Sequence, residues 1–95
     1  MIVITTFQLL PDSVEETFLT LDRRVQTELA YHESGLVRRT TARSIGGTWL
    51  VIEIWRSEDD ADASATDRAD EPLYVEFLSL IDRQSVQSDR FLTFD

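Results

Sequence analysis

Several residue types are absent or scarce in this chain, and each absence excludes a class of chemistry. The 95 residues include no cysteine, which excludes disulfides, thiolate nucleophiles and cysteine-ligated metal. The single histidine, His32, cannot build a histidine-rich metal site. The sequence also lacks a Ser-His-Asp order, a phosphate-binding glycine loop and a nucleotide fingerprint. We therefore expect no metal site, and the leading hypothesis given below requires no flavin or other cofactor.

Lysine is also absent, so every basic residue is an arginine, and the formal net charge is −9. An acidic surface repels both a nucleic-acid backbone and an anionic membrane, which argues against either as a partner. No apolar segment approaches the roughly 18 residues of a membrane span, and no signal peptide is recognisable. The sequence predicts one cytoplasmic domain over residues 1–95, because a chain of this length has no room for a second core.

The stretch 48–57, TWLVIEIWRS, is the most informative part of the sequence. It alternates an aliphatic row of Leu50, Ile52 and Ile54 with a mixed row of Trp49, Val51, Glu53 and Trp55. Bulky side chains on both faces predict a central strand. Glu53 is the anomaly, because a carboxylate in such a row needs a partner or pays a desolvation cost. The alternation does not decide which row faces the helices.

The first half of the chain predicts a strand and a helix. Ile2 to Leu9 alternates like a strand, and the following Asp12 to Glu15 fits a capping box with Asp12 as N-cap. A helix should follow, ending at Gly35. Its apolar stripe, which should cover the sheet, consists of Val14, Phe18, Leu21, Val25 and Leu29.

The second half predicts a hairpin, a broken helix and a last strand. Strand 36–44 turns at Ile45-Gly46-Gly47 into the central strand, and Ser57 is the expected N-cap of a helix over 58–69. Pro72 interrupts it, a second segment runs over 73–81, and an edge strand over 85–94 ends the chain. The order β-α-β-β-α-β predicts an α+β, ferredoxin-like fold: a four-stranded antiparallel sheet with two helices on one face.

A resemblance to a known family rests on three segments in this order: Glu33 to Leu36, the Glu53-Ile54-Trp55-Arg56-Ser57 segment, and Pro72 to Phe77. Over essentially its whole length the chain resembles the dimeric α/β-barrel family of antibiotic-biosynthesis-monooxygenase-like domains. The resemblance implies a homodimer whose two sheets face each other, with a pocket for a small aromatic or apolar molecule between each sheet and its own helices. Several members are cofactor-independent oxygenases, whereas others degrade haem, isomerise or cyclise small rings.

The chain departs from the histidine-dependent and haem-degrading members. Haem-degrading members use an asparagine, a tryptophan and a histidine at positions that fall near Thr6, Ser64 and Phe77, and this chain has no asparagine. Related oxygenases often carry histidines around the second-helix proline, where this chain has Arg68 and Leu73. These departures argue against haem degradation and against histidine-dependent chemistry.

The candidate site residues follow from these patterns. The catalytic candidates are Glu53, Tyr74, Thr6 and His32, and the substrate-binding candidates are Trp55, Trp49, Arg38 and Phe77. The structural alternatives are an ion pair with Arg38, Arg39 or Arg90 for Glu53, a solvated helix end for His32, a satisfied hydroxyl for Tyr74 and Thr6, and the core for the tryptophans. The leading hypothesis is a monooxygenase that deprotonates and orients a phenol. The alternatives are an isomerase or cyclase and a non-catalytic dimeric ligand-binding or interaction module.

Overall fold

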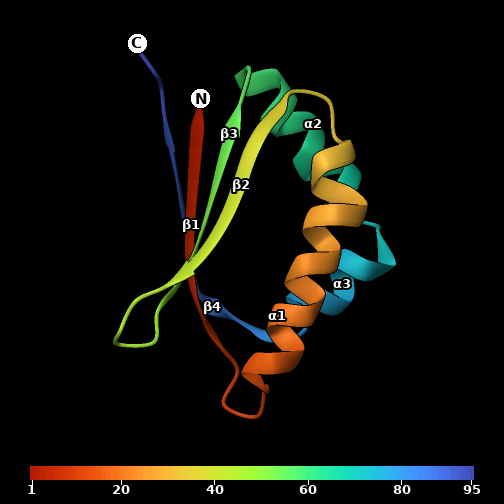
Figure 1. Ribbon diagram of the computed structural model, residues 1–95, viewed down its shortest axis with the longest axis vertical. Coiled ribbons are helices and arrows are strands. Elements are labelled where there is room, and N and C mark those ends of the chain that lie inside the picture. Colours follow the sequence, from red (N-terminus) through yellow and green to blue (C-terminus); the bar gives the residue numbers. More distant parts are fainter.

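The computed structural model describes residues 1–95. The chain forms one sheet with helices on only one of its faces (Figure 1). The four strands lie in the order β2-β3-β1-β4, and neighbouring strands are antiparallel. The elements are β1 (Ile2–Leu9), α1 (Glu15–Arg24), η1 (Val25–Leu29), η2 (Ala30–His32), β2 (Leu36–Arg43), β3 (Trp49–Trp55), α2 (Glu58–Arg68), α3 (Pro72–Leu78) and β4 (Ile81–Phe91). The predicted α+β, ferredoxin-like fold is confirmed.

The central position of β3 is also confirmed, and its register decides which row faces the helices. Glu53 lies opposite Val3 of β1 on one side and Arg39 of β2 on the other. Because side chains alternate between the faces of a strand, the mixed row of β3 shares its face with these residues. Trp49, Val51 and Trp55 of that row are buried. The aliphatic row of Leu50, Ile52 and Ile54 therefore lies on the opposite face, which no helix covers (Figure 1).

The main core lies between β1, β3 and the helices and is built around Phe18. The Phe18 ring is fully buried, and its centroid lies 5.8 Å from that of Phe7, 4.7 Å from Trp49 and 5.3 Å from Phe77. The predicted stripe is confirmed at Phe18, Leu21 and Val25, all of which are buried. It is wrong at Val14, which is 60% exposed.

The start of α1 also differs from the prediction. Val14, not Asp12, is the N-cap, its backbone is extended, and no side chain caps the helix. The reason is a turn closed by a hydrogen bond from the Ser13 amide to the Leu10 carbonyl, which leaves Asp12 before the helix. The Glu15 carboxylate does not reach back to it but pairs with Arg43 at 2.7 Å.

The predicted helix ends are confirmed in part. The helical run passes through a π-helical stretch and a short 3₁₀ turn before Gly35, which has a φ of +84° as a left-handed stop requires. The Ser57 hydroxyl accepts a hydrogen bond from the Asp60 amide at 3.1 Å and so caps α2, and Pro72 opens α3. None of the helices combines the length and apolar character needed to cross a membrane.

The predicted boundary between the last helix and β4 is wrong by several residues. α3 ends at Leu78, and β4 begins at Ile81, not at Ser85. Ile81 pairs with Leu9, beyond a register shift in the β1–β4 ladder, and these backbone bonds extend the strand. Because Ile81 is buried at a strand position, its apolar character alone could not distinguish helix from strand.

Candidate functional site

A cavity of about 260 Å³ lies between the sheet and the helices α2 and α3. The α2 side of its wall consists mainly of small residues, Ala61, Ser64 and Ala65, which leave space above the sheet. Its polar and aromatic lining comes from Thr5, Glu53, Trp55, Arg68, Tyr74, Ser88 and Arg90. We call this space the outer cavity.

A smaller chamber of about 110 Å³ shares four lining residues with the outer cavity: Thr5, Glu53, Arg68 and Tyr74. Its remaining wall consists mainly of core side chains, including Phe7, Val51, Phe77 and Ile81, together with Arg39. We call this space the inner chamber. The outer cavity is therefore the more polar space and the inner chamber the more apolar one, and we call their four shared lining residues the common wall.

Glu53 and Arg68 form the centre of the common wall. The Nη2 atom of Arg68 donates to Oε2 of Glu53 at 2.7 Å, and Arg68 also donates through Nη2 and Nε to Oε1 of Glu33 at 2.5 and 2.8 Å. The Arg68 and Glu53 side chains are only 8% and 13% exposed. Glu53 is therefore an ion-pair partner, as the alternative interpretation held, but mainly of Arg68.

The ion pairs continue from Glu53 to a second buried arginine. The Nε atom of Arg39 lies 3.8 Å from Oε2 of Glu53, and its Nη2 atom donates to Asp22 Oδ1 at 2.8 Å. The Tyr31 hydroxyl fixes the Arg39 backbone, donating to its carbonyl and accepting from its amide. Asp22, Arg39, Glu53, Arg68 and Glu33 thus form a chain of alternating charges, which we call the buried ion-pair chain.

Opposing effects act on the Arg68 guanidinium. Burial lowers the pKa of Arg68, but the hydrogen bonds that Arg68 donates to Glu33 and Glu53, together with the negative charges of these carboxylates, outweigh burial and raise the pKa above its usual value. The guanidinium also lies 5.8 Å from the centroid of the Trp55 ring and 5.5 Å from that of Tyr74. Arg68 is therefore a fixed positive charge at the cavity wall.

Trp55 contributes an unused hydrogen-bond donor. Its side chain lines the outer cavity, the residue is 3% exposed, and its Nε1 atom is buried with no hydrogen-bond partner. A buried donor left without a partner costs about 1–3 kcal/mol, so such groups are usually satisfied. Together with Arg68, this indole suits a ligand that carries a carbonyl, phenolate or enolate oxygen.

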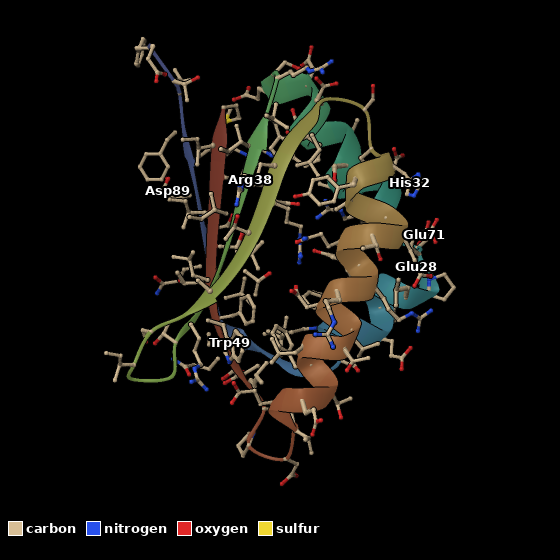
Figure 2. The ribbon with its side chains drawn as sticks, in the orientation of Figure 1. Glu28, His32, Arg38, Trp49, Glu71 and Asp89 are labelled. Atoms are coloured by element: carbon tan, nitrogen blue, oxygen red, sulfur yellow. The ribbon has the colours of Figure 1, made fainter.

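The structure brings together four of the predicted site residues. Glu53, Tyr74 and Trp55 line the outer cavity, and Phe77 lines the inner chamber. Trp49 lies against α1 in the core and lines neither space (Figure 2).

The other three predicted residues lie elsewhere. Thr6 and Arg38 pair with Leu50 and Ile54, which places both on the open face of the sheet. His32 is exposed at the end of the helical run, beside Glu28 and Glu71 and far from the open face (Figure 2).

Arg68 and Arg39 are the site residues that sequence reasoning did not select. A signal for Arg68 exists, because it follows Ala61, Ser64 and Ala65 at spacings that put all four residues on one helix face. Arg39 has a weaker signal: it is one of two adjacent arginines in β2, and only one of them can point toward the helices.

The fold and the cavity define a class, a ferredoxin-like sheet with a ligand-sized space between the sheet and its own helices. No family model and no curated protein matches the chain. Solved structures do match. A mutant of SnoaB, a cofactor-independent oxygenase from Streptomyces nogalater, superposes with a TM-score of 0.80 at 14% identity, over 99% of this chain and 92% of that chain.

Two further structures agree with this match. One is described as an antibiotic biosynthesis monooxygenase and has a TM-score of 0.76 at 19% identity, over the whole of both chains. The other, Rv0793 from Mycobacterium tuberculosis, has a TM-score of 0.71 at 22% identity, over 99% of this chain and 94% of that chain. The protein therefore has the fold of the antibiotic-biosynthesis-monooxygenase structures, as the resemblance implied.

Proposed function

We propose that the protein is a cofactor-independent monooxygenase that acts on a small aromatic or polyketide-like substrate in the outer cavity. The observation that carries the proposal is the unused Trp55 indole N–H in the same cavity wall as the fixed Arg68 cation. The likeness in fold to a structure described as a cofactor-independent oxygenase supports it. The cytoplasmic location expected from the sequence stays a prediction.

The lining residues have distinct roles in this proposal. Arg68 and the Trp55 indole bind the substrate oxygen and stabilise the negative charge that develops on it when the substrate loses a proton. The Tyr74 hydroxyl orients the ring. Glu53 already accepts a hydrogen bond from Arg68, so we assign it to holding Arg68 in position and not to removing the proton.

The reaction is balanced without a further reductant. A ring CH₂ group that is activated by a neighbouring phenol or carbonyl loses a proton to solvent water, and the resulting anion reacts with dioxygen to give a peroxide. After protonation the peroxide loses water. The CH₂ group becomes C=O, one oxygen atom enters the product, and the other leaves as water with both hydrogens.

An oxygen electrode tests the proposal with anthrone as the substrate. We expect oxygen uptake above the spontaneous rate, and lower uptake with Tyr74→Phe and Arg68→Lys. Arg43→Gln is the matched control, because Arg43 forms an exposed ion pair with Glu15 outside the cavity. If purified protein does not raise oxygen uptake above the spontaneous rate with anthrone or with quinol substrates, the proposal is overturned.

A second candidate function is a non-catalytic module that binds a small ligand. It is favoured by the buried ion-pair chain, which occupies the acidic groups at the cavity, and by the position of the sole histidine outside the cavity. Native mass spectrometry of freshly purified protein separates the two candidates when combined with oxygen uptake. Retention of an aromatic metabolite that the protein leaves chemically unchanged would favour this module.

We also propose that the protein is a homodimer joined through the open face of the sheet. This face presents Ile2, Ile4, Leu50, Ile52 and Ile54 in adjacent paired strands, and none of them is fully buried in the single chain. Phe91, paired with Ile2 on the edge strand β4, is 46% exposed. A second copy of this face would remove the apolar surface from water.

A further inference from the structure

We infer that the inner chamber is the binding site for dioxygen, separate from the organic substrate in the outer cavity. This inference rests on the proposed oxygenase function and assigns a place to its second reactant. It is carried by three properties of the chamber: its size, its apolar wall and its one unsatisfied polar group.

The chamber is too small for the organic substrate but large enough for a diatomic gas. Its volume is about 110 Å³. An engineered apolar cavity of about 150 Å³ stays dry and binds benzene or xenon. The walls formed by Phe7, Val51, Phe77 and Ile81 belong to the main core, and each of these residues is at most 8% exposed. The lining also includes Val86, which is 41% exposed, so the chamber is not sealed from solvent, and its apolar part suits a small apolar molecule.

The unsatisfied polar group is the Nε–H of Arg39. Arg39 is 3% exposed, it lines the chamber, and its Nε atom has no hydrogen-bond partner. The nearest acidic group is Glu53 Oε2 at 3.8 Å, which is beyond hydrogen-bond distance. Arg39 thus offers one free donor and a positive charge in a chamber whose polar lining also includes Thr5, Glu53 and Arg68.

This combination suits dioxygen before and after it accepts an electron. Neutral dioxygen needs only the apolar wall. When the substrate anion gives up one electron, a substrate radical and superoxide form, and no proton moves in this step. The superoxide charge then lies beside the Arg39 and Arg68 guanidinium groups, which also contact the Glu53 carboxylate, and the free Arg39 Nε–H can donate to the superoxide oxygen. The radical and superoxide then combine to form the C–O bond of the peroxide.

The common wall explains how the two reactants meet. Thr5, Glu53, Arg68 and Tyr74 line both spaces, so a ring held against them in the outer cavity borders the inner chamber. Arg68 can contact the substrate oxygen on one side and the reduced dioxygen on the other.

Xenon tests the chamber without any activity. Methyl resonances of the wild-type protein would be followed by NMR under xenon pressure. We expect saturable shifts at Val51, Leu78 and Ile81, which line the chamber, and none at Val14 and Val75, which are 60% and 49% exposed. The absence of chamber shifts would overturn the inference.

The Val51→Leu variant, which enlarges a side chain in the chamber wall, tests the assignment to dioxygen. We expect the KM for dioxygen to rise severalfold while the KM for anthrone is unchanged, because only the inner chamber is reduced. Val75→Leu is the matched control, since it makes the same change at an exposed site on α3. A variant that raises the KM for anthrone and not that for dioxygen would overturn the inference and make the chamber part of the substrate site.

The two proposals fail in different ways. If the wild-type protein consumes no oxygen with any substrate but xenon shifts the chamber methyls, the oxygenase function fails and takes the dioxygen role with it. If oxygen is consumed and xenon leaves the chamber unperturbed, the oxygenase function stands and the inner chamber is not the dioxygen site.

Discussion

The Nη2 atom of Arg68 lies 2.7 Å from Oε2 of Glu53, and this contact joins α2 to β3 through two residues that line both cavity spaces. Both side chains are largely buried, and each is engaged a second time, Arg68 with Glu33 and Glu53 with Arg39. The same contact therefore both joins α2 to the sheet and fixes Arg68 in the lining of the proposed site.

Removal of Arg68 should destabilise the protein strongly. In Arg68→Met the carboxylates of Glu33 and Glu53 lose their shared partner, and breaking a buried pair in this way costs about 3–5 kcal/mol of unfolding free energy. Arg43→Gln breaks an exposed pair and should cost less than about 1 kcal/mol. Urea denaturation of both variants measures the difference, and equal losses would contradict the role of the buried ion-pair chain.

The two tryptophans of β3 should respond differently to the same substitution. Trp55→Phe removes the unused indole donor at the cavity, whereas Trp49→Phe makes the same change in the core. We expect both to lower stability, but only Trp55→Phe to weaken binding of anthraquinone, the product expected from anthrone, by about 0.5–1.5 kcal/mol. Titration calorimetry gives the affinities, and equal binding by the two variants would argue against ligand contact by Trp55.

Replacement of Gly35 by alanine should cost more than replacement of Gly47. Both glycines have positive φ, +84° and +96°. A Cβ at Gly35 would collide with the side chain of Asp60, whereas a Cβ at Gly47 meets nothing within 4 Å. Gly47→Ala should therefore show only the backbone strain of about 1 kcal/mol or somewhat more, and Gly35→Ala a larger loss. Thermal unfolding compares the two, and similar melting temperatures would mean that Asp60 moves aside freely.

A charge on the open face should produce monomers if the proposed homodimer is correct. Ile52→Glu places a carboxylate within the aliphatic row, where a facing sheet would bury it at high cost. Ile45→Glu is the matched control, because Ile45 is fully exposed in the hairpin turn. Sedimentation should give a monomer for the first variant and a dimer for the second. A wild-type monomer would overturn the proposed homodimer.

The exposed ion pair of Arg24 and Glu28 should lower the measured pKa of Glu28. A hydrogen bond from Arg24 lowers the pKa of Glu28, so the pairing is present above the usual carboxylate range and is lost as the pH falls through the lowered value. Arg24→Gln should raise the pKa of Glu28 toward its ordinary value, as measured by NMR titration of the carboxyl carbon. Arg23→Gln is the control, and an unchanged Glu28 pKa in Arg24→Gln would show that the pair does not form in solution.

Local sequence signals determined the order of elements and most of their boundaries. The alternation in 48–57 predicted β3 and its central place, Ser57 predicted the cap of α2, and Pro72 predicted the break before α3, because each signal acts over a few neighbouring residues. Where two local signals competed, the prediction failed. Asp12 has a side chain that suits an N-cap, but the hydrogen-bonded turn between Leu10 and Ser13 includes Asp12, so α1 begins after Val14.

Only the tertiary structure decided which groups meet at the site. The sequence identified Glu53 as a carboxylate that needs a partner, but it could not select Arg68 and Arg39 over Arg38 and Arg90. That selection depends on the strand register, which puts Arg39 opposite Glu53, and on the docking of α2, which brings Arg68 over β3. The pairing of β1 and β2 with β3 also places Thr6 and Arg38 on the open face, because neighbouring side chains of a strand lie on opposite sides of the sheet. The sequence therefore showed which kinds of residue needed partners, whereas the cavity is formed by elements that meet only in the folded protein.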